Sequence, residues 1–167
     1  MARYIMVGVD GSAPATAAVE WAAADARRRR LGLRIVHVCE QRPYGRDTME
    51  YGSRILASAG ARARELAGDV EVNTALLSGN VIDILIGESA GADSVVLGCR
   101  GLGGFAGMVV GSVGLGVAGH AAEPVVIVRR LPEIQHDRVV VGYDGSGHSE
   151  AAMRYAVDQA RARGEAS

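Results

Sequence analysis

The sequence predicts an α/β protein in which helices cover both faces of an open, five-stranded parallel sheet. Two observations lead to this fold class. Apolar, strand-like runs alternate with helix-like segments along the first 130 residues, which is the pattern of βαβ units. Hydrophobic residues make up 49% of the chain, yet Phe and Trp occur once each, so the core consists of Val, Ile, Leu and Ala. Such residues suit strands that are buried beneath small-residue helices.

The first βα unit begins with an apolar strand at residues 4–9, which ends at the turn sequence Asp10-Gly11-Ser12. We expect Ser12 to cap a helix at about residues 13–30, because its hydroxyl can accept a backbone N–H and Pro14 suits a first helical turn. Gly32 is expected to stop this helix. The candidate inward positions of the helix are Ala17, Ala18, Trp21, Ala22 and Ala24.

The following elements repeat the alternation. Residues 33–39 predict a second buried strand, and a polar connection leads from it to a helix at about residues 49–67. Residues 71–77 alternate apolar and polar side chains, which predicts a strand near a sheet edge. The remaining predicted elements are a helix at residues 81–90 and strands at residues 94–98 and 124–128.

In a sheet of this kind, ligands bind beyond the C-terminal ends of the strands, where the strand order reverses. Three candidate positions lie at such ends, namely Asp10, Val38 and Gly98. Two interpretations of Asp10 stay open, because its carboxylate can contact a ligand or can simply cap the turn that follows. His37 is interpreted as a histidine of the core.

The segment after the fourth predicted strand indicates an anion site. The strand ends in Gly98-Cys99-Arg100-Gly101, and Gly111-Ser112 opens a further segment, with Ser112 expected as its N-cap. Glycines let main-chain N–H groups approach an anion closely, and a helix N-terminus adds donors and a favourable dipole. The guanidinium of Arg100 suits phosphate. The segment therefore predicts the phosphate end of a nucleotide site.

The C-terminal part of the chain repeats its beginning. Residues 139–146 restate residues 5–12, and the alanines that follow recur at the same spacing in a further helix. A single strand and helix cannot bury their own apolar faces. We therefore expect a complete domain at residues 1–130, a linker at 131–137 and, at 138–167, the beginning of a second, incomplete repeat that adds an extra C-terminal βα unit.

Composition excludes several classes of function. The net charge is −1, so no global field attracts nucleic acid or an anionic membrane. All 18 basic residues are arginine, which excludes a P-loop lysine, a Schiff-base lysine and a lysine general base. Cys39 and Cys99 lack metal-ligand spacing and are expected to be buried and reduced. Because the chain shows no signal or transmembrane segment, we expect a cytoplasmic protein. Separately, we expect no catalytic residues and no metal site built from side chains of the protein.

Three motifs together resemble a known family. Val-Gly-Val-Asp-Gly-Ser at residues 7–12, His37-Val38, and Gly98-x2-Gly101-x9-Gly111-Ser112 are similar to the universal stress protein domain, and specifically to its ATP-binding branch. The resemblance covers about residues 3–130. It implies an adenine nucleotide alpha hydrolase-like, Rossmann-like fold and a bound ATP. Mg²⁺ or Mn²⁺ is expected to accompany the phosphates, because Asp10 is a carboxylate near them.

The resemblance also implies roles for individual residues. Val9 and Asp10 are expected to contact the nucleoside, and Val38 to offer backbone hydrogen bonds to the adenine. The ribose and phosphates are expected to lie against Leu97, Gly98, Arg100, Gly101, Gly111, Ser112 and Val113. Two residues depart from the family pattern, because Gly114 stands where some members have a hydroxyl and Val81 where a proline is common.

A second glycine pattern, Gly114-Leu115-Gly116-Val117-Ala118-Gly119, matches the dinucleotide fingerprint on paper. That fingerprint must lie between a strand and its helix, with an acidic residue about 20 residues further on. Here the pattern falls inside the predicted helix after Ser112, so we interpret it as accidental.

The expected function is that of a nucleotide-dependent sensor or regulator in a stress response, with little or slow hydrolysis. Two alternatives stay open, namely an ATP-hydrolysing or adenylating enzyme of the same fold group and a nucleotide-free scaffold that docks partners. The strand at residues 124–128 predicts an apolar sheet edge that needs pairing. The resemblance suggests a homodimer through this strand, or a pseudo-dimer with a second domain.

Overall fold

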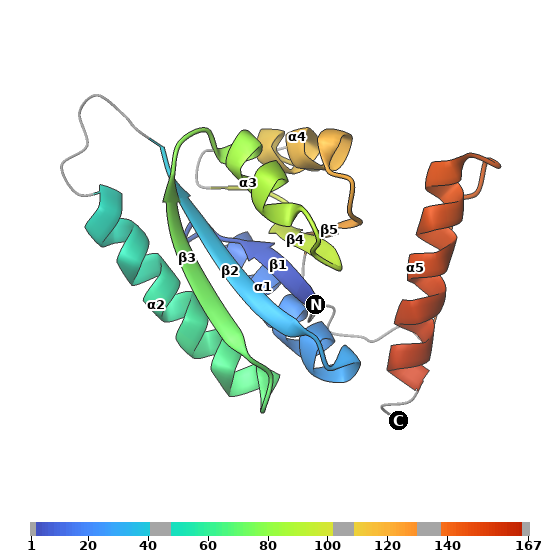
Figure 1. Cartoon of the computed structure of the whole chain (residues 1–167), viewed down its shortest axis with the longest axis horizontal. Helices are drawn as coiled ribbons and strands as arrows, with labels where there is room; N and C mark the ends of the chain where they lie inside the picture. The colour runs from blue at the N-terminus through green and yellow to red at the C-terminus, as the bar shows by residue number, and fades with distance from the viewer. Residues whose placement is uncertain (1–2, 41–47, 102–108, 130–137, 165–167) are drawn as a thin grey trace. The chain divides into compact units, whose positions relative to one another are not determined.

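The structure, a computed structural model, describes residues 3–40, 48–101, 109–129 and 138–164. By its internal contacts the chain divides into two compact units, Met1–Leu131 and Pro132–Ser167. The first unit contains the five-stranded sheet (Figure 1). In the part of the chain that is described, no helix has both the length and the apolar character needed to cross a membrane.

All neighbouring strands of the sheet are parallel, and their order is β3-β2-β1-β4-β5. The chain thus moves outward from β1 to β3 and then returns to the other side of β1 at β4. The strand order reverses between β1 and β4, where α/β proteins place their ligands. The predicted fold class and the predicted edge positions of β3 and β5 are confirmed. The strands are β1 (Tyr4–Gly8), β2 (Gly32–Cys39), β3 (Val72–Ser78), β4 (Ser94–Gly98) and β5 (Val125–Val128).

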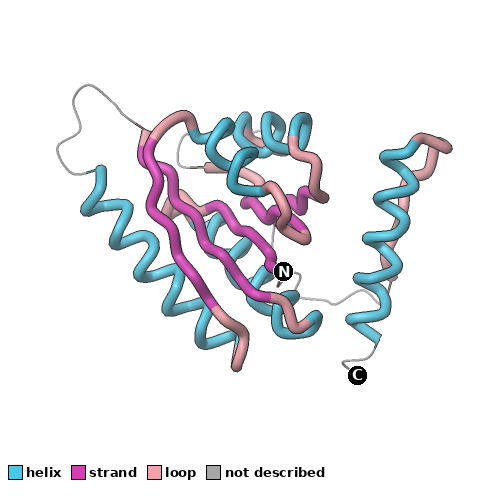
Figure 2. The backbone as a smooth tube through the Cα atoms, viewed as in Figure 1, coloured by secondary structure: helices cyan, strands magenta, loops and turns pink. Residues whose placement is uncertain are grey.

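Two helices cover each face of the sheet, as Figures 1 and 2 show. Residues of α1 (Ala13–Arg29) and α2 (Thr48–Ala67) join one hydrophobic cluster with Ile5, Val7 and Ile35. Residues of α3 (Val81–Ser89) and α4 (Ser112–His120) join a second cluster on the opposite face. Alternate residues of the buried strands supply the two clusters, as the two-residue period of a strand requires.

Helix α1 begins as the sequence predicts, because the Ser12 hydroxyl accepts the Ala15 N–H at 3.3 Å. Its buried face differs from the expected one. Ala17 and Trp21 are only partly buried, and Ala24 is half-buried. The stretch is so rich in alanine that composition does not reveal which face is apolar. The buried hydrophobic residues of α1 are Ala15, Ala18, Val19, Ala22, Ala23 and Ala26.

The end of α1 also differs from the expectation that Gly32 stops the helix. Arg30 adopts the left-handed conformation, with φ 52° and ψ 44°, and its N–H reaches the carbonyls of Ala26 and Arg27. The Leu31 N–H also bonds to the Ala26 carbonyl, at 3.0 Å. These bonds satisfy the carbonyls of Ala26 and Arg27 before any glycine is reached, so Gly32 is free to open β2.

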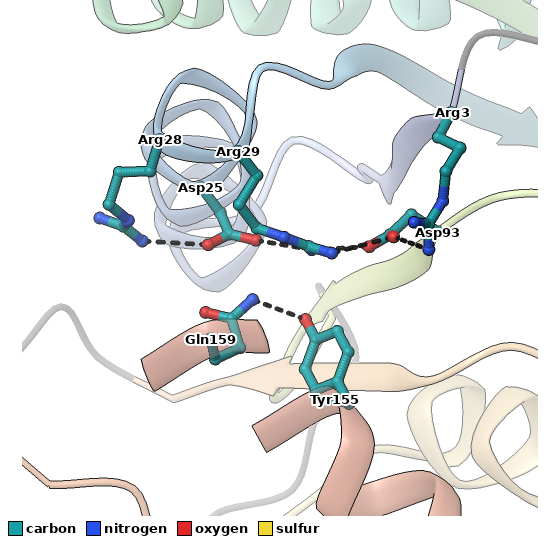
Figure 3. A network of polar contacts seen from close by, with 7 residues as sticks. All are labelled: Arg3, Asp25, Arg28, Arg29, Asp93, Tyr155 and Gln159. Atoms are coloured by element: carbon teal, nitrogen blue, oxygen red, sulfur yellow. Dashed lines mark hydrogen bonds and ion pairs between the residues drawn. The ribbon is translucent and has the colours of Figure 1, made fainter. Parts of the chain in front are cut away.

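An ion-pair network ties the end of α1 to the beginning of β4 (Figure 3). The Asp93 carboxylate accepts two hydrogen bonds from Arg29, at 2.6 and 2.9 Å, and pairs with Arg3 at 2.6 Å. Arg29 and Arg28 also pair with Asp25, at 3.3 and 3.2 Å. Burial acts to lower the pKa of Arg29, but the hydrogen bond and charge of Asp93, with those of Asp25, outweigh it and raise the pKa.

The second unit contains α5 (Gly147–Gly164), preceded by the turn Asp144-Gly145-Ser146. This turn repeats the geometry of the turn after β1. The N–H of Ser146 bonds to Asp144 Oδ1 at 2.9 Å, as Ser12 does to Asp10, and Gly145 has φ +82° where Gly11 has +85°. Residues 138–144, all of which are described, form no strand, whereas their counterparts form β1. Gln159 bonds to the Tyr155 hydroxyl within α5.

Candidate functional site

The candidate site lies at the C-terminal ends of β1 and β4. Asp10 follows β1, and its Oδ1 accepts the Ser12 N–H at 2.9 Å, so the turn-capping role of Asp10 is present. The other carboxylate oxygen lies next to Gly101, because a Cβ added there would be 2.6 Å from Asp10 Oδ2. The structure thus brings together two predicted site residues that are distant in sequence.

Gly98 lets the first turn of α1 approach the end of β4 closely. A Cβ at this position would lie 2.6 Å from the carbonyl carbon of Pro14 and 2.9 Å from the backbone nitrogen of Ala15. These are backbone atoms, which a side chain at residue 98 cannot push aside without moving the helix. The glycine therefore serves helix–strand packing at the rim of the site, in addition to any contact with a ligand.

The chain returns to the end of β4 at Gly111. The Gly111 N–H bonds to the Cys99 carbonyl at 2.8 Å, and a Cβ at Gly111 would be 3.6 Å from the Cα of Arg100. Helix α4 therefore begins beside the exposed Arg100. The intervening residues 102–108 lie outside the described part of the chain.

The N-terminus of α4 presents backbone donors. Gly111, and not Ser112 as expected, is the N-cap, and among the described residues no side chain caps this end. The helices α1 and α3 differ, because Ser12 and Asn80 cap them with side-chain oxygens. Glycine has no side chain that could accept the first backbone N–H groups of α4. The N–H groups of Ser112 and Val113 therefore point out of the N-terminal end of the helix, in the direction from which an anion would accept them.

The remaining predicted site residues divide between the two faces of the sheet. Val38 and Leu97 are buried in the cluster beneath α3 and α4. Val9 belongs to the cluster beneath α1 and α2. Its backbone is engaged on both sides, because its N–H bonds to the Val36 carbonyl at 2.9 Å and its carbonyl lies 2.7 Å from His37 Nδ1. His37 is buried, in agreement with its interpretation as a core residue.

Two of the three glycines of α4, Gly114 and Gly116, serve packing. A Cβ at Gly114 would lie 3.3 Å from Ile127 on β5, and one at Gly116 would lie 2.7 Å from Ile82 on α3. The dinucleotide-like pattern of the sequence is thus located within a helix, where it lets α4 approach its neighbours. This agrees with its interpretation as an accidental match.

Cys39 and Cys99 are both buried, as expected, and burial raises the pKa of the Cys39 thiol. A thiol with a raised pKa is less often the reactive thiolate. Among the residues that the structure describes, no three His, Cys, Asp or Glu side chains gather as a metal site.

Sequence comparisons with known proteins point to one family. The profile of the Universal stress protein family matches residues 1–129. Universal stress protein Rv2623 of Mycobacterium tuberculosis is 33% identical over 181 aligned positions, which cover 95% of this chain and 60% of that protein. Universal stress protein Mb2019 of Mycobacterium bovis is 34% identical, over 96% of this chain and 59% of that protein. The chain thus spans about 60% of the length of these curated relatives.

Solved structures share the fold. A universal stress protein crystallised in complex with cAMP is 28% identical, with a TM-score of 0.64 over 78% of this chain and 99% of that one. The universal stress protein of Archaeoglobus fulgidus has a TM-score of 0.67 at 24% identity, over 77% of this chain and 100% of its own. At the latter identity the likeness concerns the fold alone.

Proposed function

The chain belongs to the universal stress protein family, and from this premise we propose that it binds ATP at the C-terminal edge of its sheet. Bound nucleotide would make it a sensor or regulator in a stress response, with little or slow hydrolysis. The observation that carries the proposal is the N-terminus of α4, which no described side chain caps and which begins beside Arg100.

The chemistry of the edge fits a nucleotide phosphate. Backbone N–H groups and a guanidinium are donors, and phosphate oxygens are acceptors. Asp10, across the β1–β4 switch point, adds a carboxylate that can meet a ribose hydroxyl or a phosphate-bound Mg²⁺ or Mn²⁺. The relative that was crystallised with cAMP supports an adenine nucleotide. The proposed contacts are Val9, Asp10, Val38, Leu97, Gly98, Arg100, Gly101, Gly111, Ser112 and Val113.

Slow turnover is proposed because two titratable groups near the switch point already make structural bonds. Asp10 Oδ1 accepts the Ser12 N–H, and His37 Nδ1 lies 2.7 Å from the Val9 carbonyl. General-base catalysis needs a group within reach of the attacking water and able to accept its proton. Rapid ATP turnover under saturating Mg²⁺ or Mn²⁺ would instead favour an enzyme of the same fold group.

The decisive experiment is calorimetric titration of the chain and of the Gly111→Val, Ser112→Ala double variant with ATP, ADP, AMP and cAMP. Gly111 has φ −73° and ψ 166°, which valine also adopts, and an added Cβ makes ordinary contacts at 3.6 Å. We expect the double variant to keep its fold and lose ATP binding, because the valine side chain covers the helix donors.

Leu115→Ala, an exposed position one turn further along α4, is the matched control and should keep the wild-type affinity. Equal ATP affinity in the double variant and the wild type would refute the proposed site. If the wild type binds none of the four nucleotides, a nucleotide-free scaffold becomes the better explanation.

We further propose two features of assembly. Strand β5 is a sheet edge of apolar residues, so it can pair with β5 of a second copy or with a second domain. Residues 138–167 are proposed as the beginning of a second, incomplete repeat, supported by the matching turns at Asp10 and Asp144 and by the helix α5 that follows. Light scattering tests the dimer, and a monomeric mass at rising concentration would contradict it.

The cytoplasmic location stays a prediction of the sequence. Neither nucleic acid nor a membrane is part of the proposed function.

A further inference from the structure

A groove of about 290 Å³ lies between α1 and α2, on the sheet face away from α3 and α4. This volume is close to the lower end, about 300 Å³, of the range found for small-molecule sites. Asp10 is not part of its lining, although the neighbouring Gly11 and Ser12 are. Of the proposed nucleotide contacts, Val9 alone also lines the groove, so the groove adjoins that site and extends away from it between α1 and α2.

The groove has an apolar floor and polar walls. Ala15 and Val19 of α1 and Ile55 and Ala59 of α2 supply the floor. The hydroxyl-bearing side chains include Thr16, Tyr51 and Ser58. The lining residues of α2 recur every three or four positions from Tyr51 to Arg62, so the groove follows the helix for about 16 Å at 1.5 Å per residue.

The charges of the lining have one sign. Arg54 and Arg62 are guanidiniums, and the described residues that line the groove include no carboxylate. An elongated surface with an apolar floor and cationic walls is complementary to an apolar chain that carries an anionic group. The guanidiniums pair with glutamates outside the lining, and a carboxylate can exchange with such an exposed partner, whereas a neutral apolar ligand cannot.

The two arginines are not equally available. Arg62 donates to Glu20 at 2.8 Å and to Glu65 at 3.0 Å, and its hydrogen bond to Glu20, followed by that to Glu65, raises the pKa of Arg62. Arg54 pairs with Glu50 at 2.6 Å on the helix surface, where the two side chains are 75% and 66% exposed. An exposed pair contributes little, so an incoming carboxylate can replace Glu50.

The available cation also has a polar neighbour. Tyr51 lies one turn before Arg54 on α2, and its hydroxyl is 3.4 Å from the position of a Cβ at Gly11. We propose that the groove binds a linear amphipathic carboxylate. Its head lies between Arg54 and the Tyr51 hydroxyl, and its hydrocarbon chain lies on the floor between α1 and α2.

The test is calorimetric titration of the full chain with decanoate as the probe, in the presence and absence of saturating ATP. We expect decanoate to bind with an affinity that ATP leaves unchanged. Octanoate should bind more weakly, by about fourfold for each buried methylene that it lacks. Decanol, which lacks the charge, should bind more weakly than decanoate. Competition between decanoate and ATP would overturn the proposal, because it would place both in one site.

Two neighbouring exposed positions of α2 supply a matched pair of variants. Ser58 lines the groove and Ala57 does not. Ser58→Leu should weaken decanoate binding by about tenfold or more, because the larger side chain fills the groove. Ala57→Leu should have no effect. If Ser58→Leu and Ala57→Leu bind decanoate with equal affinity, the proposal is wrong, whether or not that affinity matches the wild type.

Arg54→Gln tests the head group. We expect it to weaken decanoate by about fivefold, which corresponds to one exposed ion pair, and to leave decanol unchanged. Circular dichroism of each variant establishes that the fold is kept. If decanoate fails to bind while Ser58→Leu alters the self-association of the chain, the groove holds a second copy and the carboxylate proposal is wrong.

Discussion

The carboxylate of Asp10 occupies the space that a side chain at residue 101 would need. A Cβ at Gly101 would lie 2.6 Å from Asp10 Oδ2, although the two residues belong to the ends of different strands. The same carboxylate holds the Ser12 N–H through Oδ1. Its position at the switch point is therefore set from both sides, by the turn after β1 and by the glycine after β4.

Gly101→Ala is expected to displace the Asp10 carboxylate and to weaken ATP binding. Loss of one hydrogen bond from a charged group corresponds to about 1.5–3 kcal/mol. The fold should be kept, since the half-buried side chain of Asp10 can rotate away from the added methyl group. Calorimetry with ATP measures the effect, and a thermal melt measures stability. Wild-type affinity in this variant would mean that Asp10 does not contact the nucleotide.

Gly98→Ala is expected to destabilise the protein by about 1–3 kcal/mol, because its Cβ would meet the Pro14 backbone at 2.6 Å and overpack the contact. Urea denaturation measures the change. Gly87→Ala in α3 is the control, since a Cβ there has nothing within 4 Å among the described atoms. Equal midpoints for the two variants would show that the first turn of α1 moves aside freely.

Gly119→Ala is expected to stabilise the protein by about 0.5–1 kcal/mol, because alanine is the better helix former and a Cβ has open space in the described structure. Gly116→Ala should lose this gain, since its Cβ would lie 2.7 Å from the end of the Ile82 side chain. Chemical denaturation of the two variants compares them directly. A larger gain from Gly116→Ala would contradict the proposed packing of α4 on α3.

Asp93→Ala is expected to destabilise the protein by about 3–5 kcal/mol, because it removes the main partner of the Arg29 guanidinium, whose side chain is 9% exposed. Screening by salt is weak for such a pair, so the loss should persist at high ionic strength. Glu50→Ala removes an exposed pair and should cost less than about 1 kcal/mol. Urea denaturation at low and high salt measures the free energy of unfolding of both variants. Similar losses of stability in Asp93→Ala and Glu50→Ala would contradict a stabilising role for the buried ion-pair network.

Asp144 is expected to stay ionised at lower pH than an ordinary aspartate. A hydrogen bond with the Ser146 side chain, then one from the Ser146 N–H and one with Ser149, lower its pKa from 3.8 to about 2. A lowered pKa stabilises the turn fully above pH 3.8, and this contribution is lost as the pH falls toward 2. NMR titration of the carboxyl carbon measures the pKa. Ser146→Ala should return it toward 3.8, and an unchanged value would contradict the bond.

Local chemistry explains what the sequence predicted correctly. The Ser12 cap depends on residues within one turn of each other, and the alternation in β3 revealed an edge strand without any knowledge of its neighbours. The alanines of α1 show the limit of this approach. Where nearly every side chain is small, the sequence carries no stripe that identifies the buried face, and the sheet beneath the helix decides it.

Contacts between distant elements could not be predicted. The spacing of Asp25 from Arg28 and Arg29 indicates helical ion pairs, but nothing in the sequence joins Arg29 to Asp93. The closeness of Asp10 to Gly101 likewise depends on the placement of β4 beside β1. Polar residues recur at helical spacing from Tyr51 to Arg62, which indicates that α2 has a polar flank. Only the fold places that flank opposite α1.

The paired turns at Asp10 and Asp144 have a consequence for recognition. Three consecutive residues suffice to shape this turn, since it takes the same form after a strand and where the described chain forms none. Its conformational entropy is thus lost during folding and not at the encounter with a ligand. A molecule that meets Asp10 finds a preorganised acceptor, so association should be limited by diffusion and orientation and not by rearrangement of this loop.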